Sequence, residues 1–382
     1  MTLNKPENLS QNISECRYNM SSWEKTMDTL YTYFYLFLFI PGLLLNTVAL
    51  WVLCRHISKK MKTLIFMINL AFADLAHVLS LPLRIYYYLT HTWPFGHAAC
   101  LFCFYLKYLN MYAAIVFLVC ISVQRCVFLL KPFSARRWKR KYDLLISIIV
   151  WLVVGIGCSP FILVRSGHDN STRYSSKCFK DLPTRKLPLS TAVTMMVLGE
   201  LFGFLLPLAA IGYSSACIAH SLLKTQDQDP EDPLPRGRTF TVTSSISQTE
   251  SLADRQTTED KGRALRMVLS CSALFLVCFA PYHINFLLYL LVSQGMVSRC
   301  GLKQATQMFH PVSLCLASLS CCLNPLLYYF LTTEFRRHLS KSASTFSAKL
   351  LSSPVIATYS SGRVKLLQKR LEVSTDSTAS LK

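Results

Sequence analysis

Ionisable side chains lie inside long apolar runs of this sequence, where charge is rare and usually functional. Lys107 and Arg125 share one run and are eighteen residues apart. Eighteen residues make five helical turns, or about 27 Å, so both side chains face the same way near opposite ends of a helix. Arg84 and Arg165 fall near the ends of two other runs. Because guanidinium and ammonium groups recognise phosphate and carboxylate, cations that converge on one cavity predict an anionic ligand.

Lys107 and Arg125 could instead extend to lipid head groups, with no further role. Asn110 and Tyr112 lie on the same run between them. These polar side chains favour an interior site that is open at both ends of the helix.

Two carboxylates also interrupt apolar runs. Asp74 lies twelve residues beyond Lys62. Along a helix that distance is about 18 Å, which places Asp74 near the middle of a bilayer. It is either a structural hydrogen-bond hub or a site for a sodium ion or a proton whose occupancy biases the conformation. Glu200 is expected either to pair with an outer cation or to meet an ammonium group of a ligand.

The sequence argues against catalysis and against nucleic acid. It shows no nucleophile–base pair and no metal cluster at a usable spacing, so we expect no enzyme and no metal beyond a sodium ion at Asp74. The formal net charge is +20. Since the basic residues gather between apolar runs, this charge indicates cytoplasmic loops rather than a nucleic-acid surface.

The elements that position these side chains are predicted to be membrane-spanning helices. The chain is 52% hydrophobic and 16% charged, whereas soluble domains carry roughly 25% charged residues. A span needs roughly 20 apolar residues. Suitable runs lie at 29–54, 64–90, 98–130, 144–165, 187–223, 264–292 and 303–330. The sequence therefore predicts an all-α membrane protein, a seven-transmembrane helix bundle.

Loop charge predicts the orientation of this bundle in the membrane. The connections after the first and third spans are rich in Lys and Arg, whereas the connection after the second span has neither residue from Leu89 to Leu106. By the positive-inside rule, the basic connections are cytoplasmic and the N-terminus is extracellular. Glycosylation sequons fall on the predicted outer side at Asn8, Asn12, Asn19 and Asn170.

Three regions follow from this orientation: an extracellular glycosylated N-terminus at 1–28, a membrane domain at 29–340 and a disordered cytoplasmic tail at 341–382. Within the membrane domain, residues 225–262 are rich in Ser, Thr, Asp and Pro and are predicted to form a disordered third cytoplasmic loop. Near the end of the membrane domain, Phe335 and Leu339 are four residues apart. That spacing predicts a short amphipathic eighth helix on the membrane surface.

The order of short motifs along the spans resembles the rhodopsin-like (class A) G-protein-coupled receptors over about 30–340. Each motif is weak by itself, but the full set in the right order is specific. The motifs are Gly42 with Asn46; Asn69-Leu-Ala-x-Ala-Asp74; Trp93 and Phe95-Gly96 before Cys100; Arg125 with Pro132-Phe133; Trp151; Pro207; Phe279-Ala-Pro281-Tyr282; and Asn324-Pro325-Leu-Leu-Tyr328. The resemblance implies a plasma-membrane receptor for a heterotrimeric G protein, with arrestin and receptor kinases acting on the Ser/Thr-rich loop and tail.

The resemblance also implies roles for particular residues. Cys100 would bond Cys178, and Cys16 would bond Cys300. Arg125 would dock the C-terminal helix of the G protein. The prolines would kink their helices, so that the sixth helix can swing outward. The residues of this conformational switch would be Asp74, Arg125, Phe279, Pro281, Asn324, Pro325 and Tyr328.

The chain departs from the family pattern beside Arg125. The acid that usually precedes this arginine is Gln124, and the sixth helix begins with Lys261 and Arg263 rather than an acid. Because Arg125 lacks both common carboxylate restraints, we expect raised signalling in the absence of ligand. Phe279 also stands where the family usually has a switch tryptophan.

Within the family, the motifs around Arg84, Lys107 and His283 resemble the purinoceptor-like branch and, in it, the lysophosphatidylserine receptors. Nucleotide-binding members carry Arg or Lys three residues after the histidine of the sixth helix, whereas this chain has Phe286. An apolar ring favours an acyl chain over a nucleotide. The expected ligand is an anionic lysophospholipid that binds from outside the cell, and membrane lipids are expected as further partners. The residues expected to bind it are Arg84, Lys107, Tyr108, Arg165, Glu200, Tyr282, His283 and Phe286.

Three alternatives stay open at this point. A purinergic nucleotide receptor would have the same architecture. A constitutively active receptor would signal without ligand, which Gln124 favours. An ion-coupled transporter would use Asp74 and Lys107 as coupling groups, but the chain shows no internal repeat.

Overall fold

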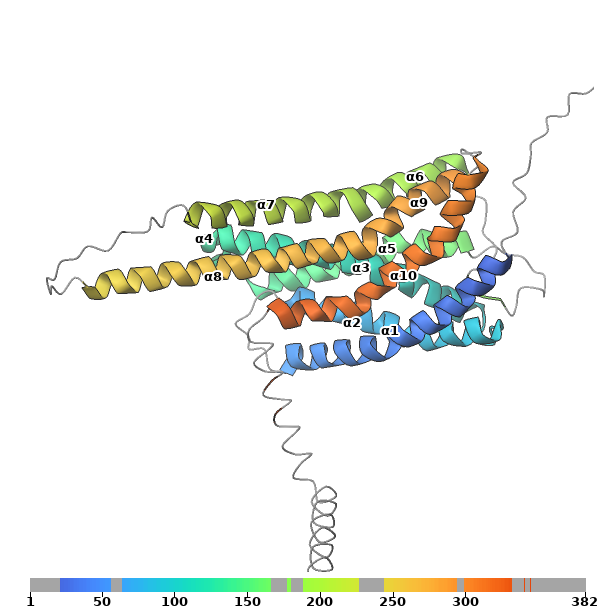
Figure 1. Cartoon of the computed structure of the whole chain (residues 1–382), viewed down its shortest axis with the longest axis horizontal. Coiled ribbons are helices and arrows are strands. Elements are labelled where there is room, and N and C mark those ends of the chain that lie inside the picture. The colour runs from blue at the N-terminus through green and yellow to red at the C-terminus, as the bar shows by residue number, and fades with distance from the viewer. Residues whose placement is uncertain are drawn as a thin grey trace, which may run out of the picture.

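The computed structural model describes residues 21–55, 64–165, 177–179, 188–226, 244–293 and 299–331, with 340 and 344. Seven helices within these residues are long and apolar enough to cross a membrane. The long helices lie alongside one another as a bundle (Figure 1). The predicted glycosylation sites Asn8, Asn12, Asn19 and Asn170, together with Cys16 and the eighth helix at 334–339, lie outside the described residues.

Most of the spans are single helices: α1 (Ser21–Arg55), α2 (Leu64–Thr90), α3 (His97–Leu130), α5 (Arg140–Arg165) and α10 (Cys300–Leu331). The short helix α4 (Pro132–Arg137) follows α3 directly. Two spans are interrupted by a π-helical turn. One joins α6 (Leu189–Glu200) to α7 (Leu206–Gln226), and the other joins α8 (Ser244–Leu274) to α9 (Ala280–Ser293).

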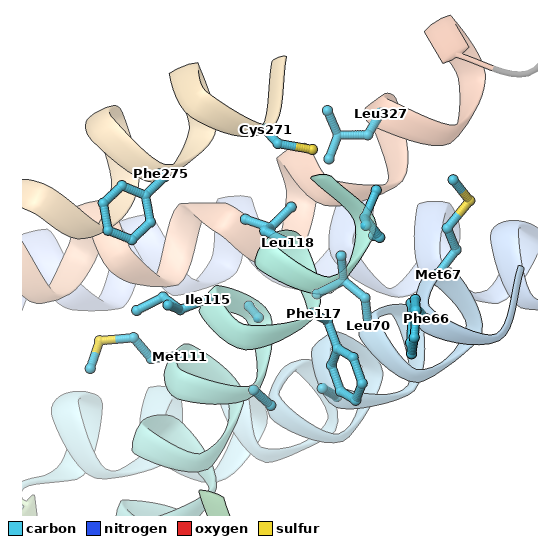
Figure 2. Packing of buried hydrophobic residues seen from close by; sticks show 14 of the residues in the cluster. Phe66, Met67, Leu70, Met111, Ile115, Phe117, Leu118, Cys271, Phe275 and Leu327 are labelled. Atoms are coloured by element: carbon cyan, nitrogen blue, oxygen red, sulfur yellow. The ribbon is translucent and has the colours of Figure 1, made fainter. Parts of the chain in front are cut away.

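Helix α3 forms the centre of the bundle and contacts α2, α5, α7, α8 and α10. Its buried apolar side chains, which include Phe117 and Leu118, pack between neighbouring helices (Figure 2). The ring of Phe117 lies 6.4 Å from that of Phe66 on α2. Large apolar side chains such as Phe37 and Ile156 are exposed on outward faces. In a bundle of spans, lipid covers these faces.

Each π-helical turn ends two residues before a proline. The turn Leu201–Leu205 precedes Pro207, and the turn Phe275–Phe279 precedes Pro281. Proline has no N–H, and its ring crowds the carbonyl four residues earlier in the chain. That carbonyl falls within the widened turn in both spans, so the turn relieves the clash and bends the helix. The structure therefore places a π-helical turn in both spans close to the prolines for which a kink was predicted.

The structure differs from the sequence prediction at the start of α8. Residues 225–262 are rich in polar side chains and were expected to be disordered, but α8 already begins at Ser244. Arg263 and Glu259, one turn apart, form an ion pair of 2.8 Å. This part of α8 extends beyond the apolar span. The polar composition of 225–262 therefore predicted a later start for the helix than the structure shows. Residues 227–243 lie outside the described part of the chain.

Candidate functional site

A cavity of about 330 Å³ lies at the outer end of the bundle, between α1, α2, α3, α9 and α10. Small-molecule sites in proteins measure about 300–1,000 Å³, so this cavity has room for a polar head group rather than for a whole lipid. The lining residues are Trp23, Glu24, Met27 and Tyr31 of α1; Arg84 and Tyr88 of α2; Phe104, Lys107 and Tyr108 of α3; Phe179; Tyr289 of α9; and Gln307, His310, Pro311 and Leu314 of α10.

Arg84 and Lys107 form a cationic floor for this cavity. Only 2% of Arg84 and 9% of Lys107 is exposed, and both line the cavity. Arg84 donates a hydrogen bond from Nη2 to the carbonyl oxygen of Cys103. Among the described residues, neither cation has a carboxylate within ion-pair distance. A buried charge without a partner is unfavourable, so the floor favours an anionic occupant.

Phe179 covers Arg84 from the connection that follows α5. The neighbouring Cys178 forms the expected disulfide with Cys100 of α3. The φ angle of Phe179 is 53°, a backbone conformation that non-glycine residues adopt only when their surroundings hold them in it. The ring centroid lies 4.5 Å from the guanidinium carbon of Arg84 and 5.4 Å from the ring of Trp93. The disulfide thus holds an aromatic face over the cation.

An aromatic wall of Tyr108, Phe161, Tyr282 and Phe286 extends from the cavity toward α5 and α9. The ring of Tyr108 stacks on that of Phe161 with centroids 4.5 Å apart. Phe161 lies 6.4 Å from Phe286, which stacks on Tyr282 at 5.6 Å. Of these residues only Tyr108 borders the cavity itself. The wall supplies apolar surface next to the cationic floor.

Glu200 and His283 form a pair that does not line the cavity. Nδ1 of His283 lies 3.5 Å from Oε1 of Glu200. The His283 ring is fully buried between Tyr112 and Phe204. The partner of Glu200 is therefore a histidine, where the sequence suggested an outer cation or a ligand. The side chain of Arg165 lies outside the described part of the structure.

Helices α1 and α10 supply lining residues that sequence reasoning did not single out. Glu24 lies in the first turn of α1, before the predicted span that starts at 29. His310 lies opposite on α10, where Nδ1 is 3.2 Å from Nδ2 of Asn285 and the ring stacks on Tyr289 at 4.5 Å. The signal in the sequence that could have identified these lining residues is helical periodicity. Positions 24, 27 and 31, and positions 307, 310, 311 and 314, each fall on one helical face.

Asp74 lies deeper in the bundle and is fully buried. Its Oδ1 accepts a hydrogen bond of 2.9 Å from Nδ2 of Asn110, and its Oδ2 accepts one of 2.9 Å from Nδ2 of Asn324. Asp74 therefore links α2, α3 and α10. This is the geometry of a hydrogen-bond hub.

The cytoplasmic end of α3 has a different network. Gln124 donates a hydrogen bond of 2.8 Å from Nε2 to Oδ1 of Asp143 on α5, and Trp138 donates one of 2.7 Å from Nε1 to the same oxygen. Within the described residues, no carboxylate lies within ion-pair distance of the neighbouring Arg125. The side chain of Tyr328 lies outside the described part.

The family model "7 transmembrane receptor (rhodopsin family)" matches residues 45–328. A protein of Mus musculus that is named as a putative purinoceptor 10 is 50% identical over 326 residues, which cover 85% of this chain and 90% of that protein. "Probable G-protein coupled receptor 174" of Homo sapiens is 46% identical over 312 residues, 82% of this chain and 86% of that protein. "Lysophosphatidic acid receptor 6" of Homo sapiens is 33% identical over 325 residues, 84% of this chain and 85% of that protein.

The match to the family covers the last part of the first span, residues 45–54, and the other six spans, and the fold agrees with it throughout the described residues. Members of this class transmit signals and do not catalyse reactions. The chain therefore belongs to the rhodopsin family of seven-transmembrane receptors, as a multi-pass plasma-membrane protein that signals through heterotrimeric G proteins.

Proposed function

We propose that this receptor binds an anionic lysophospholipid, specifically lysophosphatidylserine, and activates G proteins in response. The observation that carries the proposal is the cationic floor. Arg84 and Lys107 are buried beside an aromatic wall and have no carboxylate partner among the described residues. Such a floor suits the phosphate and carboxylate of the head group, because both bind cations through charge-assisted hydrogen bonds.

The aromatic wall supports a lipid over a nucleotide. A lysophospholipid needs apolar surface for its acyl chain next to the site of its head group. Tyr108 and Phe161 offer that surface directly beside Lys107, and Phe286 continues it. A nucleotide would require further cations for its phosphates, and Phe286 supplies an apolar ring instead. The relative named as a lysophosphatidic acid receptor is consistent with a lipid ligand for this branch.

The direct test is G-protein activation in cells that express the full-length receptor. Lysophosphatidylserine and ATP are added separately to the wild type, to Lys107→Ala and to Lys25→Ala. Lys25 is a matched control, because it is an exposed cation of α1 next to the cavity lining but not part of it. Receptor at the cell surface is quantified for each variant.

We expect the wild type and Lys25→Ala to respond to the lipid, and Lys107→Ala to lose at least about tenfold in potency, since a charge-assisted contact contributes about 1.5–3 kcal/mol. A response to ATP alone would reject the lipid proposal. A sodium ion at Asp74 stays a prediction, as do arrestin and receptor kinases as partners of the Ser/Thr-rich segments.

A further inference from the structure

The charges that line the cavity are separated by depth. Arg84 and Lys107 are buried at the floor, whereas Glu24 is exposed at the mouth. Glu24 is the one carboxylate on the lining formed by the described residues. The cavity therefore has two cations inside and one anion outside, an arrangement that a purely anionic ligand does not match.

The position of Glu24 follows from the way α1 packs. Glu24, Met27 and Tyr31 recur at helical spacing and all line the cavity, so this face of α1 points inward. Tyr31 is buried, and its ring stacks on Tyr88 with centroids 4.9 Å apart. Tyr88 lies one turn along α2 from Arg84. This stacking fixes the rotation of α1 relative to the cationic floor and brings Glu24 to the rim.

Other nearby carboxylates are engaged elsewhere. Asp28, one turn after Glu24, is buried with Oδ2 3.9 Å from Nδ1 of His91, and it does not line the cavity. Glu200 lies beside His283, also away from the lining. In the described part of the chain, Glu24 has no ion-pair partner. Among the described residues, Glu24 is therefore the carboxylate available to a cationic group of a ligand in the cavity.

We propose that Glu24 recognises the ammonium group of the ligand and so selects a zwitterionic head group over one that is only anionic. This inference rests on the proposed function. The head group of lysophosphatidylserine carries a phosphate, a carboxylate and an ammonium, which correspond group by group to Arg84, Lys107 and Glu24. Lysophosphatidic acid lacks the ammonium and leaves Glu24 as an unpaired negative charge beside its phosphate.

The test uses two lipids that differ only at this group: lysophosphatidylserine and its deamino analogue, in which hydrogen replaces the ammonium. Concentration–response curves for G-protein activation are measured on the full-length wild type, Glu24→Gln and Glu24→Lys. Lys25→Gln is the matched control, because it changes the charge of the adjacent exposed residue outside the lining. Lysophosphatidic acid serves as a third ligand without ammonium.

For Glu24→Gln we expect about a fivefold loss of potency for lysophosphatidylserine, as for one partly exposed ion pair, and no loss for the deamino analogue. Glu24→Lys should favour the deamino analogue, and Lys25→Gln should leave the ratio of the two potencies unchanged. Equal shifts for both lipids in the Glu24 variants would overturn this inference and leave the proposed function standing. A wild type that responds to neither lipid would overturn both.

Discussion

Gln124 is hydrogen-bonded to Asp143 through 2.8 Å between Nε2 and Oδ1, so the residue before Arg125 is tied to α5 rather than to Arg125 itself. Trp138, just after α4, donates to the same carboxylate oxygen. The network holds α3, α5 and the end of α4 together. Gln124, the residue before Arg125, contributes an amide to this network, whereas the family usually has a carboxylate at that position.

The first prediction concerns this arrangement. Gln124→Asp should lower G-protein activation in the absence of ligand, because it places a carboxylate beside Arg125 that disfavours release of the arginine toward a G protein. The new carboxylate would also lie close to Asp143, and like charges repel. The double variant Gln124→Asp with Asp143→Asn removes that repulsion and serves as the control. Ligand-free signalling equal to that of the wild type in both variants would contradict the expectation of raised basal activity.

Gly203 leads to a prediction about stability. A Cβ atom at this position would lie 2.6 Å from Cε1 of Tyr112 and 2.7 Å from Cε1 of His283. Gly203→Ala must therefore displace the packed rings of Tyr112 and His283 or the turn itself, at a cost of about 1–3 kcal/mol. We expect a melting temperature of the purified receptor lower by several degrees. Gly212→Ala is the matched control, since a Cβ there meets nothing within 4 Å. Equal melting temperatures for the two variants would contradict this account of the turn.

Phe179 leads to a prediction about ligand recognition. Phe179→Leu keeps an apolar side chain but removes the aromatic face over Arg84. A cation–π contact contributes about 0.5–2 kcal/mol, so the potency of an anionic lysophospholipid should fall about two- to thirtyfold. Phe179→Tyr keeps the face and should restore most of that potency. Equal ligand potencies in Phe179→Leu and Phe179→Tyr would show that the aromatic ring does not position the guanidinium of Arg84.

The bundle and part of the site could be predicted from the sequence, because long apolar runs identify spans and helical spacing places polar side chains on them. Arg84, Lys107 and Tyr108 line one cavity, as helical spacing predicted, and their binding of a ligand stays a prediction. Glu24 was missed because the first turn of α1 is polar and precedes the apolar run. His310 lies within the predicted span 303–330 and was missed because the sequence does not show which face of that span borders the cavity.

The residues of the sixth span show a different limit of sequence reasoning. Tyr282, His283 and Phe286 lie at the expected end of the bundle, yet Tyr289 is the residue of α9 that lines the cavity. Tyr282, Phe286 and Tyr289 recur at helical spacing and share one face of α9, so Tyr289 differs from the other two by its position closer to the end of the helix. Helical spacing does not show how far along α9 the cavity extends, so this part of the lining could not be predicted.

The most direct test of the central claim is equilibrium binding of lysophosphatidylserine to the purified full-length receptor, with ATP as competitor. We predict that the wild type and Lys25→Ala bind the lipid equally and that ATP does not displace it. Arg84→Ala should bind at least about tenfold more weakly, because its loss leaves one anionic group of the ligand without a charge-assisted partner. Displacement by ATP, or wild-type affinity in Arg84→Ala, would contradict an anionic lipid on the cationic floor.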